Sequence, residues 1–338
     1  MRLQDITVSV CIPTRHRPGL LERAIKSCGE QSVVPSEIVI GDDSDDARTE
    51  ALVGRLRAAV PIPLIYLRNT PPLGQSRNVD RVFASATGDW LLLLHDDDWL
   101  LPDAIESLLA PLRRPHNIDV VYGKQFLASN DGVIDCEQSE ALNDAFLRDH
   151  HQTGLQPNAL RSAILQQFPN DGYLVRGPLA RQVGYHRDDV KDGCDFAFGL
   201  NLALADAKFY CVDAYTAVYR FSATSVSRSA GRDTMSLDMA ATTRKCLHLL
   251  DRNDFEVRTK VRDDLYRAVV WCGLNRTRRV EALRWAISPR WGLRWWRREG
   301  VLAAAAIIAP GLRQRVRAWL RSTSDGAMPA GARAKRLV

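Results

Sequence analysis

Three consecutive aspartates, Asp96, Asp97 and Asp98, follow closely on four leucines, Leu91–Leu94. The leucines predict a short strand that is buried on both faces, so the acids stand at the end of that strand. Carboxylates packed this closely repel one another unless something positive lies among them. A hard divalent cation, which prefers oxygen ligands, is the simplest counter-charge. The run predicts a metal site at the three aspartates, with a solvated acidic turn as the alternative.

The elements that would position this run alternate in the order of an open α/β sheet. Apolar strands alternate with helices that have one apolar face, a pattern typical of a mostly parallel sheet flanked by helices. The predicted strands cover 6–12, 37–41, 63–67 and 91–94, and the predicted helices cover 19–31, 47–58, about 75–86 and 104–109. The first strand is expected to stop at Pro13.

Polar residues follow the first two strands as well. Pro13, Thr14 and Arg15 come after the first, and Asp42 and Asp43 after the second. The carboxyl ends of parallel strands meet at one edge of the sheet, where open α/β folds bind their ligands. We therefore expect a binding crevice at this edge.

The pattern between residues 120 and 221 is less regular. Strands are expected at 120–122, 133–134, 209–212 and 214–221, an extended segment at 172–177, and helices near 143–150 and 159–167. A further helix is expected to begin near Asp195.

Several motifs occur together in one order and spacing. They are Pro13-Thr14-Arg15, Asp42-Asp43-Ser44, Gly74 with Arg77-Asn78, Asp96 to Pro102, Val183-Gly184-Tyr185, Asp195, and Tyr219-Arg220. In this combination the sequence resembles the family 2 glycosyltransferases over about residues 5–228. The resemblance implies a GT-A fold, which is a Rossmann-like α/β fold, with a DXD-type metal motif. It also implies inverting transfer of a sugar from a nucleotide-diphosphate donor, with Mn²⁺ or Mg²⁺ as cofactor.

The resemblance assigns Pro13, Thr14, Arg15, Asp42 and Asp43 to the base and ribose of the donor. A carboxylate suits this task, because it accepts hydrogen bonds from N–H groups and hydroxyls. The alternative for the two aspartates is that each caps the turn between a strand and a helix.

The resemblance also makes Asp97 the principal metal ligand, Asp96 a residue that contacts both donor and metal, and Asp98 an accessory ligand. Arg77 would hold the base or the diphosphate, since a planar guanidinium suits oxyanions; the alternative is an exposed helix arginine. His95 stands where the family usually has an acid. We expect it to contact the ribose or to pack against the strand, with no metal role.

Asp195 matches the catalytic base of the family, which removes the proton of the acceptor hydroxyl. The family has a Glu-Asp pair here, whereas this chain has Cys194-Asp195, and Asp192 is a competing candidate. Relatives often carry a histidine after Tyr-Arg that completes the metal site, whereas Phe221 follows Arg220 here.

Charge divides the chain into an acidic and a basic part. Residues 241–338 hold 22 Lys and Arg against 8 Asp and Glu, and residues 1–240 hold 24 against 32. Tryptophans and arginines within Trp291–Arg321 flank Val301–Ala309, an apolar stretch too short to span a bilayer. This pattern predicts attachment to a membrane surface. Packing against the catalytic domain stays open as the alternative, and nucleic acid is not an expected partner.

The cysteines and the first residues indicate a compartment. Seven scattered cysteines without a Cys-x-x-Cys pair favour a reducing environment over disulfides or zinc. The chain enters an apolar strand by Ile6 without a signal-peptide pattern. We expect a cytoplasmic protein, peripheral on the inner face of the cell membrane if the tail binds lipid.

These observations combine into one expected organisation. A GT-A domain covers 1–228, with a nucleotide-sugar half at about 1–124 and an acceptor half at about 125–228. A basic helical extension covers 229–322, and a disordered tail 323–338. The expected activity is transfer from a UDP- or dTDP-sugar to a glycan or lipid-linked acceptor in surface polysaccharide biosynthesis. The alternative is a non-catalytic subunit that binds nucleotide or serves assembly.

Overall fold

The computed structural model describes residues 6–113, 117–188, 193–221, 242–243, 246–251, 253–275 and 278–286. The chain forms two compact units. The first contains Met1–Asp188 and Cys194–Ala223, and the second contains Asp189–Gly193 and Thr224–Val338.

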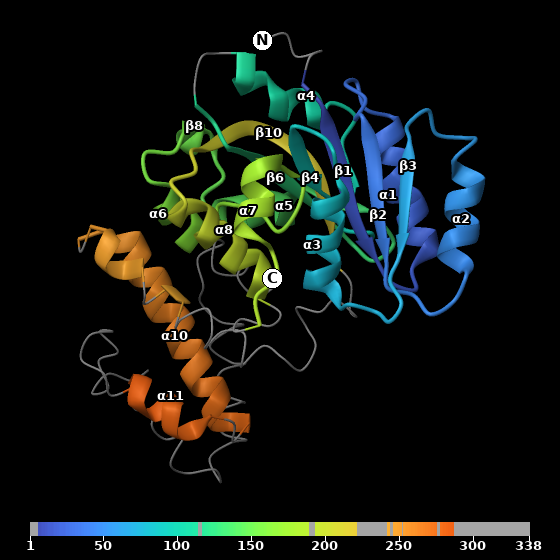
Figure 1. The fold of residues 1–338 in the computed structure, drawn as a ribbon. Coiled ribbons are helices and arrows are strands. Elements are labelled where there is room, and N and C mark those ends of the chain that lie inside the picture. The colour runs from blue at the N-terminus through green and yellow to red at the C-terminus, as the bar shows by residue number, and fades with distance from the viewer. Residues whose placement is uncertain are drawn as a thin grey trace. The chain divides into compact units, whose positions relative to one another are not determined.

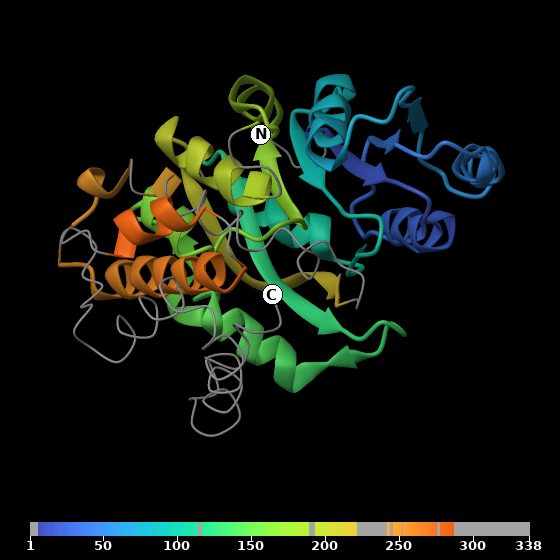
Figure 2. The same ribbon diagram turned by 90° about the horizontal axis from the view of Figure 1, so that it is seen from below.

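The first half of the first unit is a parallel sheet between two helical layers. Its strands lie in the order β3-β2-β1-β4 and pair in parallel. They are β1 (Val8–Thr14), β2 (Glu37–Asp42), β3 (Leu64–Arg68) and β4 (Trp90–Leu93). The helices α1 (Pro18–Gly29) and α2 (Arg48–Leu56) cover one face, and α3 (Gln75–Ser85) covers the other (Figures 1 and 2). This is the predicted doubly wound α/β arrangement.

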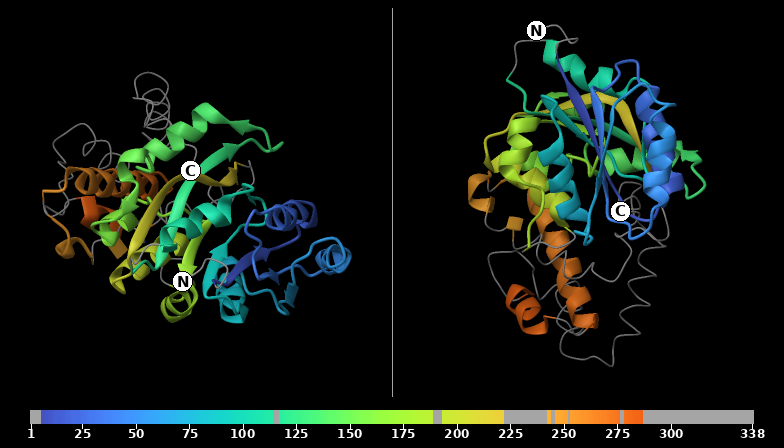
Figure 3. Two further views of the ribbon diagram at one scale, coloured as in Figure 1. Left: turned by 90° about the horizontal axis from the view of Figure 1, so that it is seen from above. Right: turned by 45° about the vertical axis from the view of Figure 1, so that its right-hand side comes forward.

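Antiparallel strands extend the same sheet on the far side of β4. The order continues β4-β9-β6-β10-β5, and β9 runs antiparallel to both of its neighbours. The two long strands β6 and β10 run side by side in parallel (Figure 3). The bounds are β5 (Trp99–Leu100), β6 (Val120–Ala128), β9 (Tyr173–Arg176) and β10 (Phe209–Arg220), with β7 (Ile134–Asp135) beside β6 and β8 (Gly154–Leu155) beside β10.

Short helices connect these strands. They are α4 (Ala104–Leu109), α5 (Cys136–Ala145), α6 (Ala159–Ile164), α7 (Gly177–Val183) and α8 (Cys194–Leu204), with 3-10 turns at η2 (Ala110–Arg113) and η3 (His150–Gln152). The prediction for α5 was wrong by about seven residues. Asp135 accepts a hydrogen bond from the backbone N–H of Gln138 at 2.9 Å and starts the helix there, as an N-cap does.

Two further predicted boundaries were wrong. The strand β1 passes through Pro13, which lies opposite Gly41 of β2, while its pairing with β4 ends at Cys11. A proline is tolerated there because only one side of the strand is still paired. The two predicted closing strands at 209–212 and 214–221 are one strand, β10, whose register against β6 shifts between Cys211 and Ala217.

The core lies around the central parallel strands. Val10 and Ile12 of β1, Ile40 of β2 and Leu92 of β4 are fully buried in one apolar cluster. All four leucines of Leu91–Leu94 are inaccessible to solvent, which confirms the predicted strand buried on both faces. The acidic run that follows is therefore anchored to the most rigid part of the fold.

The described part of the second unit consists of the 3-10 turn η6 (Leu247–Leu249) and the helices α10 (Phe255–Asn275) and α11 (Arg279–Ala286) (Figure 1). The helix α10 buries Val257, Val261 and Leu265 at helical spacing. No helix among the described residues combines the length and the hydropathy that crossing a membrane requires. The predicted interfacial segment 291–321 and the tail 323–338 lie outside the described residues.

Candidate functional site

The carboxyl ends of β1 and β4 are joined by a side-chain hydrogen bond. Thr14 ends β1, and its Oγ1 donates to Oδ2 of Asp96 at 2.7 Å, although 82 residues separate the two in sequence. Both residues are buried. Thr14 and the acidic run therefore meet at this edge of the sheet, where the crevice is predicted.

Arg17, at the start of α1, supplies the positive charge of this site. Its Nη1 lies 2.8 Å from Oδ2 of Asp97 and 3.3 Å from Oδ1 of Asp96. Burial and the Asp97 charge raise the pKa of Asp96 to about 6, against the opposing effect of Arg17. Burial by itself lowers the pKa of Arg17, but the charges of Asp96 and Asp97 raise it above its ordinary value.

Asp98 faces inward and meets a second acid. Oδ1 of Asp98 accepts a hydrogen bond from the backbone N–H of Arg220 at 2.6 Å, and its Oδ2 lies 3.8 Å from Nδ1 of His95. Asp171 lies beside them and accepts the backbone N–H of His95 at 3.0 Å. Burial, followed by the charges of Asp171 and Asp97, raises the pKa of Asp98 well above its usual range.

His95, Asp97 and Asp98 together fit a divalent cation. Each offers a ligand atom, and these atoms lie within 4.8 Å of one another. Oδ2 of Asp98 and Nε2 of His95 are buried without a hydrogen-bond partner among the described residues. Oxygen and imidazole donors suit Mn²⁺ and similar ions. The structure thus adds His95 to the group, where we expected no metal role, and directs Asp96 toward Thr14 and Arg17.

The two aspartates that were predicted to bind the nucleotide already form hydrogen bonds within the protein. Asp42 is buried, with Oδ2 accepting from the Tyr66 hydroxyl at 2.7 Å and Oδ1 from the Ser44 backbone at 2.9 Å. Asp43 accepts the backbone N–H of Gly74 at 2.7 Å and so holds the loop before α3. The Asp42–Ser44 contact is that of a turn cap, the alternative raised above, whereas the contacts with Tyr66 and Gly74 join distant parts of the chain. Contact with a nucleotide stays a prediction for both aspartates.

The remaining predicted donor residues differ in their environment. Pro13 is buried within β1, whereas Arg15 is exposed and makes no hydrogen bond or ion pair with another described residue. Arg77, near the start of α3, is exposed and pairs with Oδ1 of Asp188 at 3.0 Å and Nε2 of His186 at 3.1 Å. Arg77 is thus held by the chain that leads toward α8.

Asp195 lies in the first turn of α8, as predicted, and is partly exposed. Burial raises its pKa above the ordinary aspartate value, while a hydrogen bond from the Phe196 backbone and the charge of His95 act in the opposite direction. Phe198, one turn along α8 from Asp195, lies 6.4 Å from the Tyr173 ring, and Tyr173 pairs with Leu93 at the end of β4 that leads into the acidic run. Asp192 lies outside the described residues.

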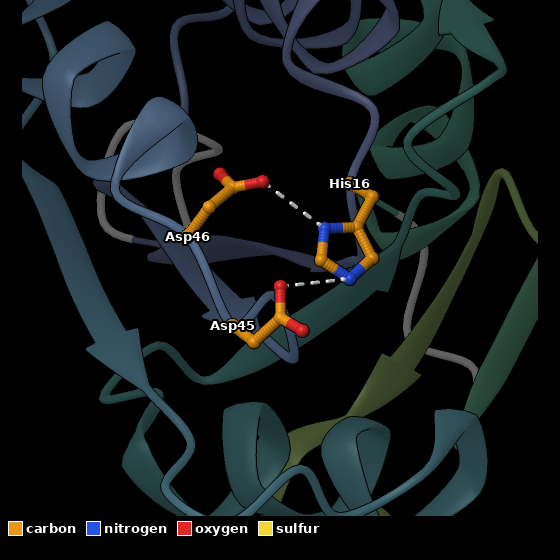
Figure 4. A group of neighbouring side chains, drawn as sticks. All are labelled: His16, Asp45 and Asp46. Carbon is orange, nitrogen blue, oxygen red and sulfur yellow. Dashed lines mark hydrogen bonds and ion pairs between the residues drawn. The ribbon is translucent and has the colours of Figure 1, made fainter.

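A second group of possible metal ligands lies at the start of the β1–α1 loop. His16 contacts Asp46 at 3.3 Å and Asp45 at 3.5 Å (Figure 4). Asp46 also binds Arg48, at 2.8 Å. Because Asp45 is 83% exposed and none of the three side chains has a buried polar atom without a partner, this group is a surface ion-pair cluster.

Arg17 and Asp171 were missed by the sequence reasoning. Arg17 meets Asp97 across 80 residues, and no local pattern links the two. A signal did exist for Asp171, which directly precedes the apolar segment Tyr173–Val175 as an acid within an Asn-Asp-Gly turn. Neither residue was placed at the site.

A cavity of about 590 Å³ lies beside α1, apart from this group of acids. Its lining includes Arg23, Lys26, Trp99 and Leu101. None of the predicted site residues lines it, and Arg23 stacks on the Trp99 ring at 3.3 Å.

Comparison with known proteins identifies similar sequences and folds. Residues 9–155 match the family described as Glycosyl transferase family 2. The abequosyltransferase RfbV of Salmonella typhimurium is 33% identical over 172 residues, which are 50% of this chain and 47% of that protein. The chain spans between 33% and 63% of the length of the first curated relatives that it matches.

Two solved structures share the fold. S. aureus TarS 1-349 in complex with UDP-GlcNAc has a TM-score of 0.65 and 16% identity, over 94% of this chain and 92% of that one. The mannosyltransferase PcManGT of Pyrobaculum calidifontis, in complex with GDP-Man and Mn²⁺, has a TM-score of 0.58 and 16% identity, over 98% and 84%.

Proposed function

We propose that this chain, which belongs to the family 2 glycosyltransferases through residues 9–155 and has their GT-A fold, is an inverting, metal-dependent glycosyltransferase. The donor is a nucleotide-diphosphate sugar, with UDP or dTDP as the nucleotide. The acceptor is a hydroxyl of a glycan or of a lipid-linked saccharide. The product belongs to a surface polysaccharide.

One observation carries this proposal: a group of aspartates suited to a cation and a separate aspartate suited to act as a base lie at the same edge of the sheet. Asp97 and its neighbours form a charged group with Arg17, and Asp195 approaches that group from the start of α8. A cation-binding group and a separate carboxylate are what a single displacement requires. One serves the departing diphosphate, and the other serves the incoming hydroxyl.

Asp97, Asp98 and His95 would hold Mn²⁺ or Mg²⁺, since one ligand atom of each lies within 4.8 Å of the others. Asp96, predicted as a further ligand, would take part through an oxygen that now bonds Thr14 or Arg17. A bound divalent cation neutralises charge on the diphosphate leaving group. Support comes from the orphaned acceptor on Asp98 and from PcManGT, a protein of the same fold whose complex contains Mn²⁺.

Asp195 would act on the acceptor. Its carboxylate takes the proton of the acceptor hydroxyl while that oxygen forms a bond to the anomeric carbon and the bond from that carbon to the diphosphate breaks. Attack from the face opposite the leaving group inverts the configuration. The raised pKa of Asp195 makes the carboxylate a stronger base than an exposed aspartate.

The support for the donor, the acceptor and the cellular location is more general than the support for the transfer reaction. TarS was solved with UDP-GlcNAc, which supports a nucleotide-sugar donor, and RfbV is an abequosyltransferase, which supports sugar transfer. We place the protein in the cytoplasm, with its basic tail on the inner face of the cell membrane. The seven free thiols suit a reducing compartment.

A panel of UDP-, dTDP- and GDP-sugars tests the proposal. Binding of each is measured by calorimetry with and without Mn²⁺, and slow hydrolysis by release of the nucleoside diphosphate. We expect at least one donor to bind in a cation-dependent way and to be hydrolysed. Binding without turnover, even when glycan acceptors are supplied, would favour the non-catalytic alternative, and absence of all binding would refute a nucleotide-sugar site.

A further inference from the structure

Arg17 contacts one oxygen of each of the carboxylates Asp96 and Asp97. Its Nη1 is 2.8 Å from Oδ2 of Asp97 and 3.3 Å from Oδ1 of Asp96. Among the described residues, no other cation forms an ion pair with Asp97. The guanidinium therefore offsets part of the negative charge of the pair in the cation-free protein.

A divalent cation on either oxygen of Asp97 would lie close to the guanidinium of Arg17, which contacts Oδ2. Two positive charges on one carboxylate repel each other, and in a partly buried site this repulsion is poorly screened. Cation binding to Asp97 is therefore weakened while Arg17 stays in place and strengthened when Arg17 moves away. Its backbone cannot move far, because Pro18 at the next position begins α1, which packs on the core through Leu21 and Ile25.

The released guanidinium needs another anion within reach of its side chain. The diphosphate of a nucleotide bound beside the cation would supply phosphate oxygens, which the planar fork of arginine binds well. A cation that binds without nucleotide gives Arg17 no such replacement partner.

We propose that Arg17 is a positioning residue that couples cation binding to diphosphate binding. Arg17 holds Asp96 and Asp97 in the free protein, competes with the cation for them, and transfers to the diphosphate when cation and nucleotide bind together. This inference rests on the proposed function. It adds that the cation by itself binds weakly and that the nucleotide strengthens its binding partly through Arg17.

The test compares Arg17→Gln with Arg176→Gln. Arg176 makes a similar ion pair, with Nε 3.1 Å from Oδ1 of Asp119, and Asp119 and Asp97 are both 17% exposed. Arg176 lies opposite Trp90, at the amino end of β4, and the site lies beyond the other end of that strand. Arg176→Gln thus controls for loss of a half-buried arginine outside the site.

Mn²⁺ affinity is measured without nucleotide, from the electron paramagnetic resonance signal of the free ion. UDP affinity is then measured by calorimetry at saturating Mn²⁺. Arg17→Gln should bind Mn²⁺ by itself about fivefold more tightly or better, and should bind UDP about fivefold more weakly or worse. Arg176→Gln should match the wild type in both measurements.

Arg17→Lys extends the test if Arg17→Gln does not fold in cation-free buffer, where Asp96 and Asp97 would repel each other. A lysine keeps one charge, but its ammonium is more strongly hydrated and lacks the planar fork that binds two phosphate oxygens at once, so it should compete less well for the carboxylates and bind the diphosphate less well. Its Mn²⁺ affinity should exceed that of the wild type and its UDP affinity should be lower. Thermal melting with and without Mn²⁺ should show a larger stabilisation by Mn²⁺ in both variants than in the wild type.

Mn²⁺ affinity that stays unchanged or falls in the folded Arg17 variants would overturn the competition. Unchanged UDP affinity would overturn the transfer to the diphosphate. If the proposed function is wrong, the result is different. The wild type itself then binds no nucleoside diphosphate with any cation, so there is no diphosphate binding to which cation binding could be coupled.

Discussion

Thr14 and Asp96 are joined by a hydrogen bond of 2.7 Å that connects the end of β1 to the acidic run after β4. Together with Arg17, this bond engages both oxygens of Asp96. Asp97 bonds Arg17 through Oδ2 only, and its Oδ1 accepts no hydrogen bond from the described residues. Asp97 is therefore the acid of the pair with a free oxygen, which supports its assignment as principal metal ligand.

Replacing Asp97 with Asn should weaken cation-dependent binding of UDP or dTDP. The change removes one negative charge from the cation group, and we expect a loss of at least tenfold, about 1.4 kcal/mol. Calorimetry with Mn²⁺ measures it. The control is Asp103→Asn, which alters an exposed acid at the start of α4 and should change nothing. A folded Asp97 variant with normal metal-dependent affinity contradicts the assignment.

Replacing Asp195 with Asn should leave donor affinity near normal, because the base acts on the acceptor. Turnover should fall by about 10² to 10⁴, the usual contribution of a general base. Asn keeps an oxygen that can accept the 2.7 Å bond from the Phe196 backbone, so the helix start should survive. Donor hydrolysis measures the rate, with Asp206→Asn, an exposed residue just after α8, as the control. Normal turnover would place the base elsewhere, with Asp192 tested next.

The activity should fall as the pH is lowered through the pKa of Asp195. Burial raises that pKa, and a base acts only when ionised, so the acid limb of kcat/KM should lie above the ordinary aspartate value of about 3.9. The raised pKa also means that ionised Asp195 lowers stability near neutral pH. This cost shrinks as the pH falls through the folded-state pKa and is gone below the ordinary aspartate value of the unfolded chain. Asp195→Asn should therefore melt no lower than the wild type at neutral pH. Two results would contradict the assignment of Asp195 as a base with a raised pKa. One is an acid limb of kcat/KM at or below the ordinary aspartate value, and the other is a clearly lower melting temperature of Asp195→Asn.

Replacing Gly41 with Ala should destabilise the site edge. A Cβ at this position in β2 would lie 2.1 Å from Oδ1 of Asn78 and 2.7 Å from Cγ1 of Val82, so α3 would have to shift. We expect a loss of about 1–3 kcal/mol in the free energy of unfolding. Gly54→Ala is the opposite case, because Gly54 is exposed in α2 and its Cβ meets nothing within 4 Å. That variant should gain roughly 0.5–1 kcal/mol. Denaturant unfolding compares the two, and equal effects would contradict the packing argument.

The full chain should sediment with vesicles that contain anionic lipid and much less with neutral vesicles. Higher salt should weaken the binding, since exposed charges are screened beyond about 10 Å at 0.1 M. Replacing Arg297 and Arg298 of the segment Trp291–Arg321 with Gln should lower the binding, and the same change at Arg48 and Arg55 of α2 should not. Equal binding to both kinds of vesicle, or to neither, removes the membrane interpretation in favour of a tail that packs on protein.

Local pattern was enough to predict the parallel half of the sheet and the acidic strand end. Leu91–Leu94 had to form a buried strand, because four adjacent leucines leave no polar face, and the acids then had to stand at its end. The start of α8 at Cys194–Asp195 followed from the family motif. The cap that starts α5 at Asp135 was not predicted.

Tertiary structure alone decided which groups meet. The pairing of Arg17 with Asp97 depends on how α1 leaves β1 and how β4 aligns beside it. The approach of Asp171 to Asp98 depends on the antiparallel register of β9 on β4. Periodicity determines which face of an element is buried, whereas contacts between residues about 80 apart depend on the register of neighbouring strands, which no local pattern encodes.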